Sequence, residues 1–205
     1  YLSSLEGEIK QKYEGYLENF HYAFVEYQGG TLGHWGFDDL STTERLSASR
    51  VCSTALLFAD GDITNKGDRA ERLKLELGDR IYILPCKEIE NILPLEVIEA
   101  TSKSIFSRKK SKTTLDLDET NLGNISLKQI NSSNLGIGYH LDKCLGLVGK
   151  GKNNRRIFAD ESGTINEKVK FCREALEVMS TIDWELSQPI KKVCTIIFEH
   201  ISKFN

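Results

Sequence analysis

The middle of the chain alternates short apolar runs with amphipathic segments. Two runs, TALLFA at residues 54–59 and DRIYILP at 79–85, have the length and composition of buried strands. The segment between them, KGDRAERLKLELG, has the apolar spacing of an amphipathic helix that ends at its final glycine. An earlier run, HYAFVEY, predicts another buried strand, which stops at Glu26. Strands that alternate with helices predict an α/β fold, with a mostly parallel sheet flanked by helices.

Helical periodicity predicts further helices outside this sheet, and Pro189 suits the first turn of the last one. Residues 107–154 differ in character, with a basic cluster, many Asn and Ser residues and a glycine-rich end. This composition predicts an inserted, partly helical segment or small lobe. The segment RRIFADE after it predicts a last strand. The further helices are expected within 1–20, 87–106, 166–182 and 188–204.

These changes along the chain predict its division into parts. Because the sequence opens with Tyr1 instead of methionine, we expect one domain of a longer protein. The expected parts are a helix or linker from a preceding domain (1–20), the first part of the core (21–106), the insertion (107–154), and the C-terminal part of the core with its closing helices (155–205).

Composition sets few limits on function. The formal charge of -3 gives no global attraction to nucleic acid, so such binding would need local basic patches. The five cysteines are widely spaced among apolar neighbours, which is typical of reduced thiols and favours a cytoplasmic location. No apolar run approaches the ~20 residues that cross a bilayer, so we expect no membrane association.

Acidic residues follow two of the predicted strands. Glu26 ends the first, and Asp60 and Asp62 end the second with only Gly61 between them. Since ligands bind outside the carboxyl ends of parallel strands, we expect these carboxylates to converge. Two negative charges ~4 Å apart repel by about 4 kcal/mol at an effective dielectric of about 20, so they need a counter-charge. Mg²⁺ (or Mn²⁺) would supply it, and Gly61 would let a large ligand approach the backbone.

The Asp-Gly-Asp triplet also has a purely structural interpretation. It is typical of a turn after a strand, in which Asp62 would cap the following helix. The spacing alone does not separate the two interpretations. Glu26 favours the functional one, because a carboxylate on an otherwise apolar strand needs a partner when it is buried.

Acidic motifs recur in a definite order along the chain. A glutamate ends one strand (FVEY), an Asp-x-Asp pair ends a later one (FADGD), and an EIEN motif with Glu88 and Glu90 follows the next (LPCKEIENILP). This order resembles the TOPRIM domain, in the version found in the OLD-family (overcoming lysogenization defect) nucleases and related prokaryotic antiphage defence effectors. Downstream, NEKVKFCREA resembles the family's element in which a lysine, here Lys168, precedes a helix. The resemblance covers most of the chain outside 107–154.

The resemblance implies a TOPRIM-like sheet and an Mg²⁺- or Mn²⁺-dependent endonuclease that hydrolyses phosphodiester bonds, in DNA in preference to RNA, for antiviral defence. It implies an ATPase domain, on the same chain or as a separate subunit, and an oligomeric assembly. It also implies roles for six residues: Glu26, Asp60 and Asp62 as catalytic residues that hold metal, Glu88 and Glu90 as ligands or orienting groups of a second ion, and Lys168 as the catalytic lysine that neutralises charge on the phosphate.

The chain departs from the family pattern at one position. Many OLD-type domains carry an acidic residue four positions after the glutamate of the first strand, where this chain has Gly30. One metal ligand is then absent or comes from elsewhere, with Asp38 and Asp39 as candidates. A one-metal mechanism, a weak enzyme or an enzyme that needs a larger assembly would each fit this departure.

A basic segment near the end of the insertion is a candidate for nucleic-acid binding, because binding to a phosphate backbone needs only positive charge and donors. Its residues GLVGKGKN come within one residue of a phosphate-binding loop, but Asn153 stands where Ser or Thr is required. A solvated basic turn is the structural alternative. The candidate contacts are Lys150, Lys152, Arg155 and Arg156.

Two other functions fit the same motifs. A metal-dependent phosphatase or phosphotransferase would also place Asp-x-Asp after a strand, with Asp60 as its nucleophile. A degenerate TOPRIM module would bind nucleic acid or a partner protein without cleavage.

Overall fold

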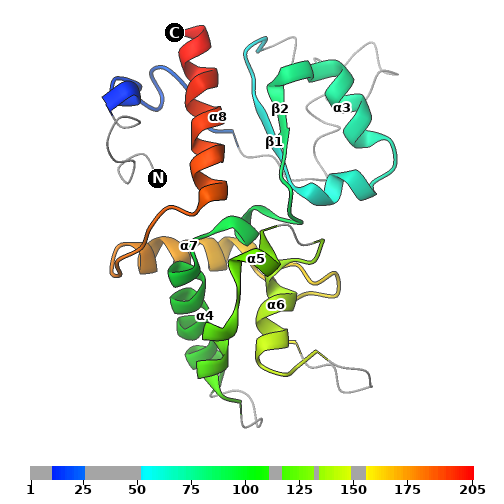
Figure 1. Ribbon diagram of the computed structural model, residues 1–205, viewed down its shortest axis with the longest axis vertical. Helices are drawn as coiled ribbons and strands as arrows, with labels where there is room; N and C mark the ends of the chain where they lie inside the picture. Colours follow the sequence, from blue (N-terminus) through cyan, green and yellow to red (C-terminus); the bar gives the residue numbers. More distant parts are fainter. Residues whose placement is uncertain (1–10, 26–51, 111–116, 132–133, 149–155) are drawn as a thin grey trace. The chain divides into compact units, whose positions relative to one another are not determined.

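The computed structural model describes residues 11–25, 52–110, 117–131, 134–148 and 156–205 (Figure 1). The chain forms two compact units, each with its own hydrophobic core. The first contains the chain up to Ala59 together with Ile63–Ile83 and Lys191–Asn205, and the second contains Asp60–Asp62 together with Leu84–Ile190.

The first unit contains a small parallel sheet. Strand β1 (Leu57–Ala59) pairs with β2 (Ile81–Ile83), with Leu57 opposite Ile81, and helix α3 (Arg69–Leu77) connects the two strands. Buried side chains of α3 pack with those of the strands in one core. A parallel pair joined by a helix confirms the α/β prediction at this level, for a sheet of two strands in the described part of the chain.

Helix α3 ends where the sequence predicts. Gly78 follows its last residue with a φ of 59°, in the left-handed region that favours glycine, and its N–H donates to the carbonyl of Lys74. A short 3-10 helix (Gly78–Arg80) then leads into β2.

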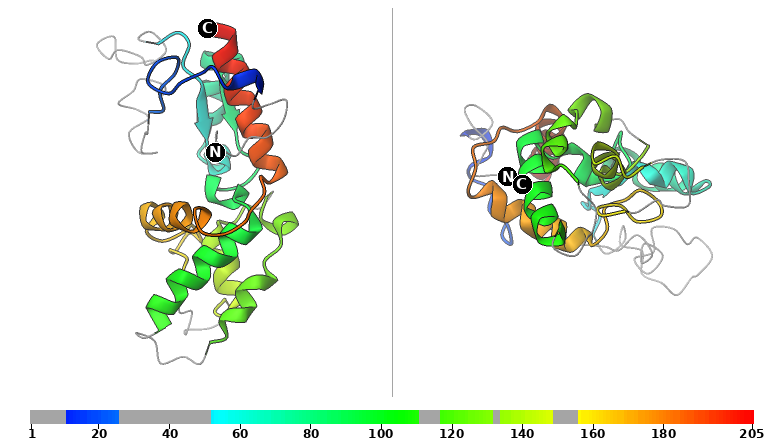
Figure 2. Two further views of the ribbon diagram at one scale, coloured as in Figure 1. Left: turned by 90° about the vertical axis from the view of Figure 1, so that its left-hand side faces the viewer. Right: turned by 90° about the horizontal axis from the view of Figure 1, so that it is seen from below.

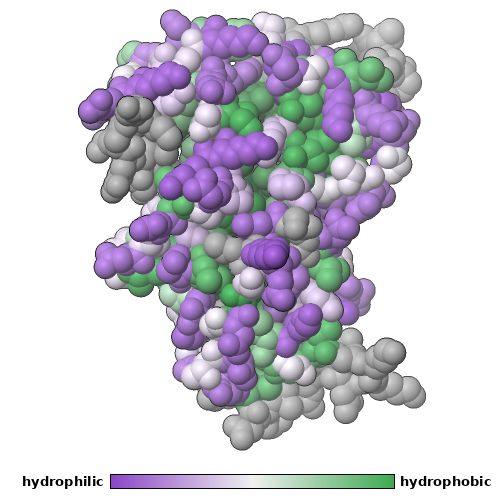
Figure 3. All heavy atoms as spheres, viewed as in Figure 1, coloured by the Kyte–Doolittle hydropathy of each residue, from purple (hydrophilic) through white to green (hydrophobic). Residues whose placement is uncertain are grey.

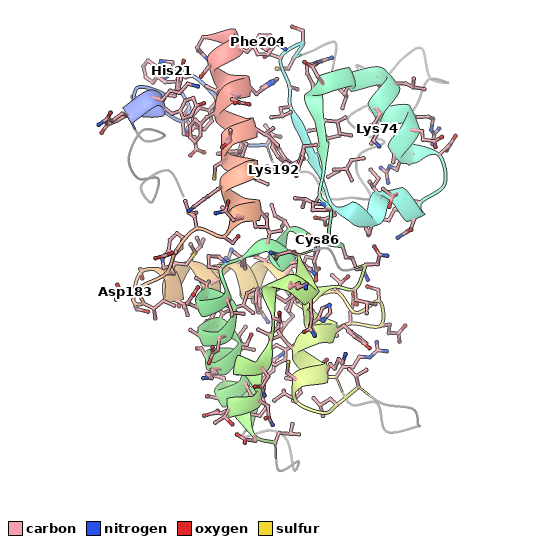
Figure 4. The ribbon with its side chains drawn as sticks, in the orientation of Figure 1. His21, Lys74, Cys86, Asp183, Lys192 and Phe204 are labelled. Atoms are coloured by element: carbon pink, nitrogen blue, oxygen red, sulfur yellow. The ribbon has the colours of Figure 1, made fainter. Side chains whose placement is uncertain are left out.

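Helix α8 (Gln188–Phe204) has the bounds that the sequence predicts, with Pro189 in its first turn. From Lys191 on it belongs to the first unit. Its His200 Nε2 lies 2.6 Å from the carbonyl oxygen of Thr54, and Lys192, labelled in Figure 4, lies over the ring of Tyr82. These contacts agree with the views in Figure 1 and Figure 2, where the strands lie between α3 and α8.

The strand predicted for HYAFVEY is wrong for the residues that the structure describes. Residues 21–25 form only an isolated bridge, between Tyr22 and Glu18. The N–H of Asn19 donates to the carbonyl of Tyr22, and Asn19 has a φ of 65°, so the chain turns here instead of extending. Glu26 lies outside the described residues. Of the helix predicted within 1–20, the described part is helical only at residues 11–13.

The second unit is built mainly from helices. Phe106 of one helix and Phe171 of another are almost fully buried in its core. Two 3-10 helices, Ile89–Ile92 and Glu119–Asn124, lie between the longer elements. The helices are α4 (Leu95–Lys110), α5 (Leu127–Ile130), α6 (Ile137–Cys144) and α7 (Lys168–Met179).

Pro94 explains why the helix predicted within 87–106 starts later than expected. Residues 89–92 form a 3-10 helix, and α4 begins directly after the proline. A proline has no N–H and cannot continue a helix that precedes it, but it can accept at the start of the next one. The carbonyl of Pro94 accepts from the N–H of Ile98 in this way.

Residues 107–154 are not a separate lobe where the structure describes them. Leu122, Ile130, Ile137 and Leu141 have no exposed surface and belong to the same core as residues of α4 and α7. The predicted partial helicity is confirmed by α5 and α6. The compact units do not divide at 106 or 155, and apolar side chains of the segment supply part of this core.

The last strand predicted from RRIFADE is also absent from the described residues 156–161. Ala159 forms one isolated antiparallel bridge with Ile165. Oδ1 of Asp160 accepts from the N–H groups of Ser162 and Thr164, so the chain forms a tight turn. This turn leads into α7.

The surface carries few unusual features. Hydrophilic residues cover much of the face shown in Figure 3, with hydrophobic residues between them. Among the described residues, the exposed large hydrophobic side chains include Phe20, Leu75 and Leu176. No helix in the described part of the chain combines the length and apolar character needed to cross a membrane.

A lysine-centred acidic cluster as the candidate functional site

Asp60 enters the second unit directly after β1 ends at Ala59. Its Oδ1 accepts a hydrogen bond from the N–H of Ile89 at 3.0 Å. The N–H of Gly61 donates to the carbonyl of Cys86 at 2.9 Å. Residues 86–89 therefore hold Asp60 in place through one hydrogen bond to its carboxylate and one to the backbone N–H of the next residue.

Gly61 has a different role from the one expected. A Cβ on this residue would lie 2.2 Å from the carbonyl oxygen of Cys86 and 2.7 Å from that of Leu84. Glycine is required so that the two segments of backbone can meet, and the space expected for a ligand is filled by the protein itself. Cys86, labelled in Figure 4, lies on the segment between β2 and the first 3-10 helix of the second unit.

Lys168 brings three of the predicted acidic residues together. Its Nζ lies 3.1 Å from Oε2 of Glu88 and 3.3 Å from Oε2 of Glu90. It lies 3.5 Å from Oδ2 of Asp60. The side chains of Glu88 and Glu90 are 1% and 5% exposed, whereas those of Lys168 and Asp60 are 36% and 37% exposed. The cluster is thus closed on the side of the glutamates and open to solvent at the lysine and the aspartate.

Burial and charge act in opposite directions on these groups. Burial raises the pKa of the Asp60 and Glu88 carboxyls above their ordinary values, although Lys168 opposes the shift. Burial alone would lower the pKa of Lys168, but Glu90, Asp60 and Glu88 outweigh it and raise that pKa. Lys168 therefore stays a cation and is the counter-charge of the cluster in the described residues.

The two oxygens of Glu88 have different partners. Oε1 accepts from the N–H of Ile137 at 2.8 Å and from that of Ile165 at 3.3 Å, while Oε2 faces Lys168. Ile137 is the first residue of α6, so this carboxylate satisfies one of the unpaired donors at the start of that helix. A Cβ on Gly136 would lie 2.4 Å from Oε1, so only glycine leaves room for the carboxylate there.

Asn91, the last residue of the EIEN motif, has no exposed surface and binds the same part of the chain. Its Nδ2 donates to the carbonyls of Ile130 and Leu135, each at 3.0 Å. The motif thus fastens α5 and the start of α6 to the acidic cluster. These partners lie in the segment that the sequence predicts to be an insertion.

Cys172 is a neighbour of the cluster that sequence reasoning missed. Its Sγ lies 3.7 Å from Oε1 of Glu90. Burial, together with the charge of Glu90, raises the pKa of this thiol to about 11. Cys172 follows Lys168 by four residues on a predicted helix, so both lie on one helical face. This spacing was the sequence signal that could have identified Cys172.

The other predicted site residues are not among the contacts of Lys168. Asp62 lies half-buried in the first turn of a 3-10 helix (Gly61–Asn65), and its charge adds to the raised pKa of Asp60. It does not cap α3, whose N-cap residue is Asp68. Arg156 donates through Nη1 to the carbonyl of Asp160. The predicted residues that lie outside the described part are Glu26, Gly30, Asp38, Asp39, Lys150, Lys152, Asn153 and Arg155.

The cluster contains oxygens of the type that binds hard divalent cations. Oε2 of Glu88 and Oε2 of Glu90 are buried, have no hydrogen-bond partner of standard geometry, and form ion pairs with Lys168. Carboxylate oxygens of this kind are the ligands that Mg²⁺ and Mn²⁺ prefer. Within the described residues, no group of three or more His, Cys, Asp or Glu side chains has the arrangement of a metal site.

The second unit also contains a pocket, which is not lined by Asp60, Glu88, Glu90 or Lys168. It lies between α4 and α7 and contains both acidic and basic side chains. Arg108 pairs with Glu174, Lys170 pairs with Glu167, and Lys109 donates to the carbonyl of Ile157. Arg108 and Lys109 thus link α4 to other segments of the unit, whereas the pair of Lys170 with Glu167 lies within the start of α7.

No family model, no curated protein and no solved structure matches this chain. The order of the acidic motifs and their geometry around Lys168 are the observations that bear on function.

Proposed function

We propose that this chain is a metal-dependent nuclease domain of the TOPRIM type, related to the OLD-family nucleases, which hydrolyses phosphodiester bonds of DNA in preference to RNA. The observation that carries the proposal is the set of contacts made by Lys168, whose Nζ lies within 3.5 Å of Asp60, Glu88 and Glu90. Three separate motifs supply these four side chains, and the family resemblance assigns a role to each of them.

The roles follow from charge and exposure. Asp60, Glu88 and Glu90 present one oxygen each towards Lys168, and these oxygens would hold Mg²⁺ or Mn²⁺. When bound, the cation would activate the attacking water and neutralise the phosphate. Lys168 remains protonated and partly exposed, so its ammonium would stabilise the negative charge that develops on the phosphate oxygens.

Other features of the proposal come from the family resemblance and from the sequence. Glu26 would complete the ligand set from the first predicted strand, and Asp62 would add charge beside Asp60. An ATPase domain, on the same chain or as a separate subunit, and an oligomeric assembly would accompany the nuclease in antiphage defence. The basic residues Lys150, Lys152, Arg155 and Arg156 would contact the phosphate backbone.

A plasmid-nicking assay on the full chain, with Mn²⁺, Mg²⁺ or a chelator, tests the proposal. We expect cleavage only with the metals, and a loss of about 100-fold in rate for Lys168→Ala, because one preorganised group that stabilises transition-state charge contributes this much. Lys170→Ala is the matched control, because Lys170 is an exposed residue of the same helix that pairs with Glu167. Its rate should equal that of the wild type.

The same assay separates the alternatives. A phosphatase or phosphotransferase would hydrolyse a generic phosphate ester with metal and leave the plasmid intact, and Asp60→Asn would abolish that activity. A binding module would shift the plasmid in a gel without cleavage under any metal, and Glu90→Gln would not change the shift. Either result would replace the nuclease proposal.

A further inference from the structure

Two residues of α7 contact the two oxygens of the Glu90 carboxylate. Nζ of Lys168 lies 3.3 Å from Oε2, and Sγ of Cys172 lies 3.7 Å from Oε1 as the donor. Residues at positions i and i+4 lie on the same face of an α-helix, so one face of α7 presents both groups to Glu90.

A buried glutamate carboxylate must be held in one orientation if one of its oxygens is to bind a cation. The last torsion of a glutamate side chain is broad, and a half-turn only exchanges two equivalent oxygens, so it is the plane of the carboxylate that must be held. Oε2 of Glu90 is buried and has no hydrogen-bond partner, and it points towards the ammonium of Lys168. A donor on Oε1 selects this orientation over its alternatives.

We propose that Cys172 is a positioning residue of the acidic cluster, whose thiol donates to Oε1 of Glu90 and so keeps Oε2 directed at Lys168. The geometry that supports it is the contact of 3.7 Å, in which sulfur is the donor. The consequence for metal binding rests on the proposed nuclease function, but the hydrogen bond itself does not.

Infrared spectroscopy of the S–H stretch tests the hydrogen bond without metal or substrate. The difference between the wild type and Cys172→Ala isolates the band of Cys172, and the same difference for Cys144→Ala isolates a half-buried control thiol at the end of α6. We expect the Cys172 band at the lower frequency, and a shift to higher frequency in Glu90→Gln, because a neutral amide is a weaker acceptor than a carboxylate. Coincident bands that Glu90→Gln leaves unchanged would overturn the proposal.

Calorimetric titration with Mn²⁺ tests the consequence for the site. We expect Cys172→Ala to weaken Mn²⁺ binding about tenfold. This is the low end of the range for loss of a group that orients a metal ligand, because a thiol is a weak hydrogen-bond donor. Cys172→Ser restores a donor and should bind Mn²⁺ nearly as the wild type does, and Cys144→Ala should have no effect. Equal affinity in Cys172→Ala and the wild type would overturn the positioning role.

The two measurements also separate this proposal from the nuclease proposal. If the wild type binds no Mn²⁺, the metal-dependent function fails, and the infrared bands still decide whether Cys172 orients Glu90. If Mn²⁺ binds with the expected dependence on Cys172 but no nucleic acid is cut, the positioning role stands and the nuclease does not.

Discussion

Oε1 of Glu88 accepts a hydrogen bond from the backbone N–H of Ile137, at 2.8 Å and across 49 positions of the chain. The other oxygen of the same carboxylate lies 3.1 Å from Nζ of Lys168. One side chain therefore joins the start of α6 to the acidic cluster. The geometry of the cluster and the packing of the second unit depend on the same residue, which leads to the first prediction.

Glu88→Ala should destabilise the protein by about 3 kcal/mol, since it leaves buried N–H groups unpaired and removes one partner of a buried ion pair. Glu88→Gln keeps an acceptor at Oε1 and should destabilise the protein clearly less. Urea unfolding at neutral pH measures both. Equal losses for the two variants would show that the hydrogen bonds to Ile137 and Ile165 contribute little.

Gly61→Ala should destabilise the protein by about 2 kcal/mol or more, because its Cβ would overlap the carbonyl oxygens of Cys86 and Leu84. Gly15→Ala is the control, as a Cβ there meets nothing within 4 Å. Thermal unfolding compares the two variants. A stable Gly61→Ala protein would contradict the close approach of these backbone segments.

Lys168→Met should destabilise the protein by about 3 kcal/mol at neutral pH, at the lower end for loss of one partner of a buried ion pair, because the ammonium is 36% exposed. The three carboxylates then lack their counter-charge. Mn²⁺ should raise the melting temperature of this variant more than that of the wild type, since the cation replaces the lost charge. Scanning calorimetry at several Mn²⁺ concentrations measures the effect, and an equal response of the two proteins would show that Lys168 and the cation do not compete for these carboxylates.

We expect the stability of the protein to depend on pH through Glu174 of α7. Its hydrogen bond from Ser104 and its pair with Arg108, both on α4, lower the pKa of this carboxyl below its ordinary value of 4.5. A carboxyl whose pKa is lower in the folded than in the unfolded state stabilises the folded protein above about pH 4.5. This stabilisation is lost as the pH falls through the folded-state pKa.

The contribution of Glu174 can be measured with Glu174→Gln. At pH 7 the variant should be less stable than the wild type by about 1 kcal/mol, the usual size for one such interaction. The difference should disappear in acid, below the folded pKa. Urea unfolding between pH 3 and pH 7 gives the curve, and a difference that stays constant with pH would assign the effect to packing instead of charge.

Local patterns determined much of this protein. The apolar spacing and the final glycine predict α3, and the amphipathic run after Pro189 predicts the whole of α8, because each helix depends mainly on residues within its own turns. The same holds for β1 and β2. The family resemblance named Asp60, Glu88, Glu90 and Lys168 as site residues. It also named Glu26, which lies outside the described residues, and Asp62, which is not among the ion pairs of Lys168.

Contacts between distant residues decided the rest. Leu122 and Ile137 belong to a core that includes residues of α4 and α7. The composition of residues 107–154 does not show this packing, because it depends on residues outside the segment. A turn closed by the hydrogen bond from Asn19 N–H to the carbonyl of Tyr22 lies where the expected strand would begin. The Nδ1 atom of His21 also accepts from the N–H of Leu17, and local bonds of this kind compete with strand pairing.

The contacts within the acidic cluster also depend on residues that are far apart in the chain. Three features of the cluster depend on how residues 84–92, α6 and α7 meet within the second unit. They are the carbonyl groups that fill the space at Gly61, the partners of each Glu88 oxygen, and the contact of Cys172 with Glu90. The sequence alone specifies the residues that carry charge and the helices that present them. Tertiary packing specifies the partner of each oxygen, because that depends on distances between segments that are far apart in the chain.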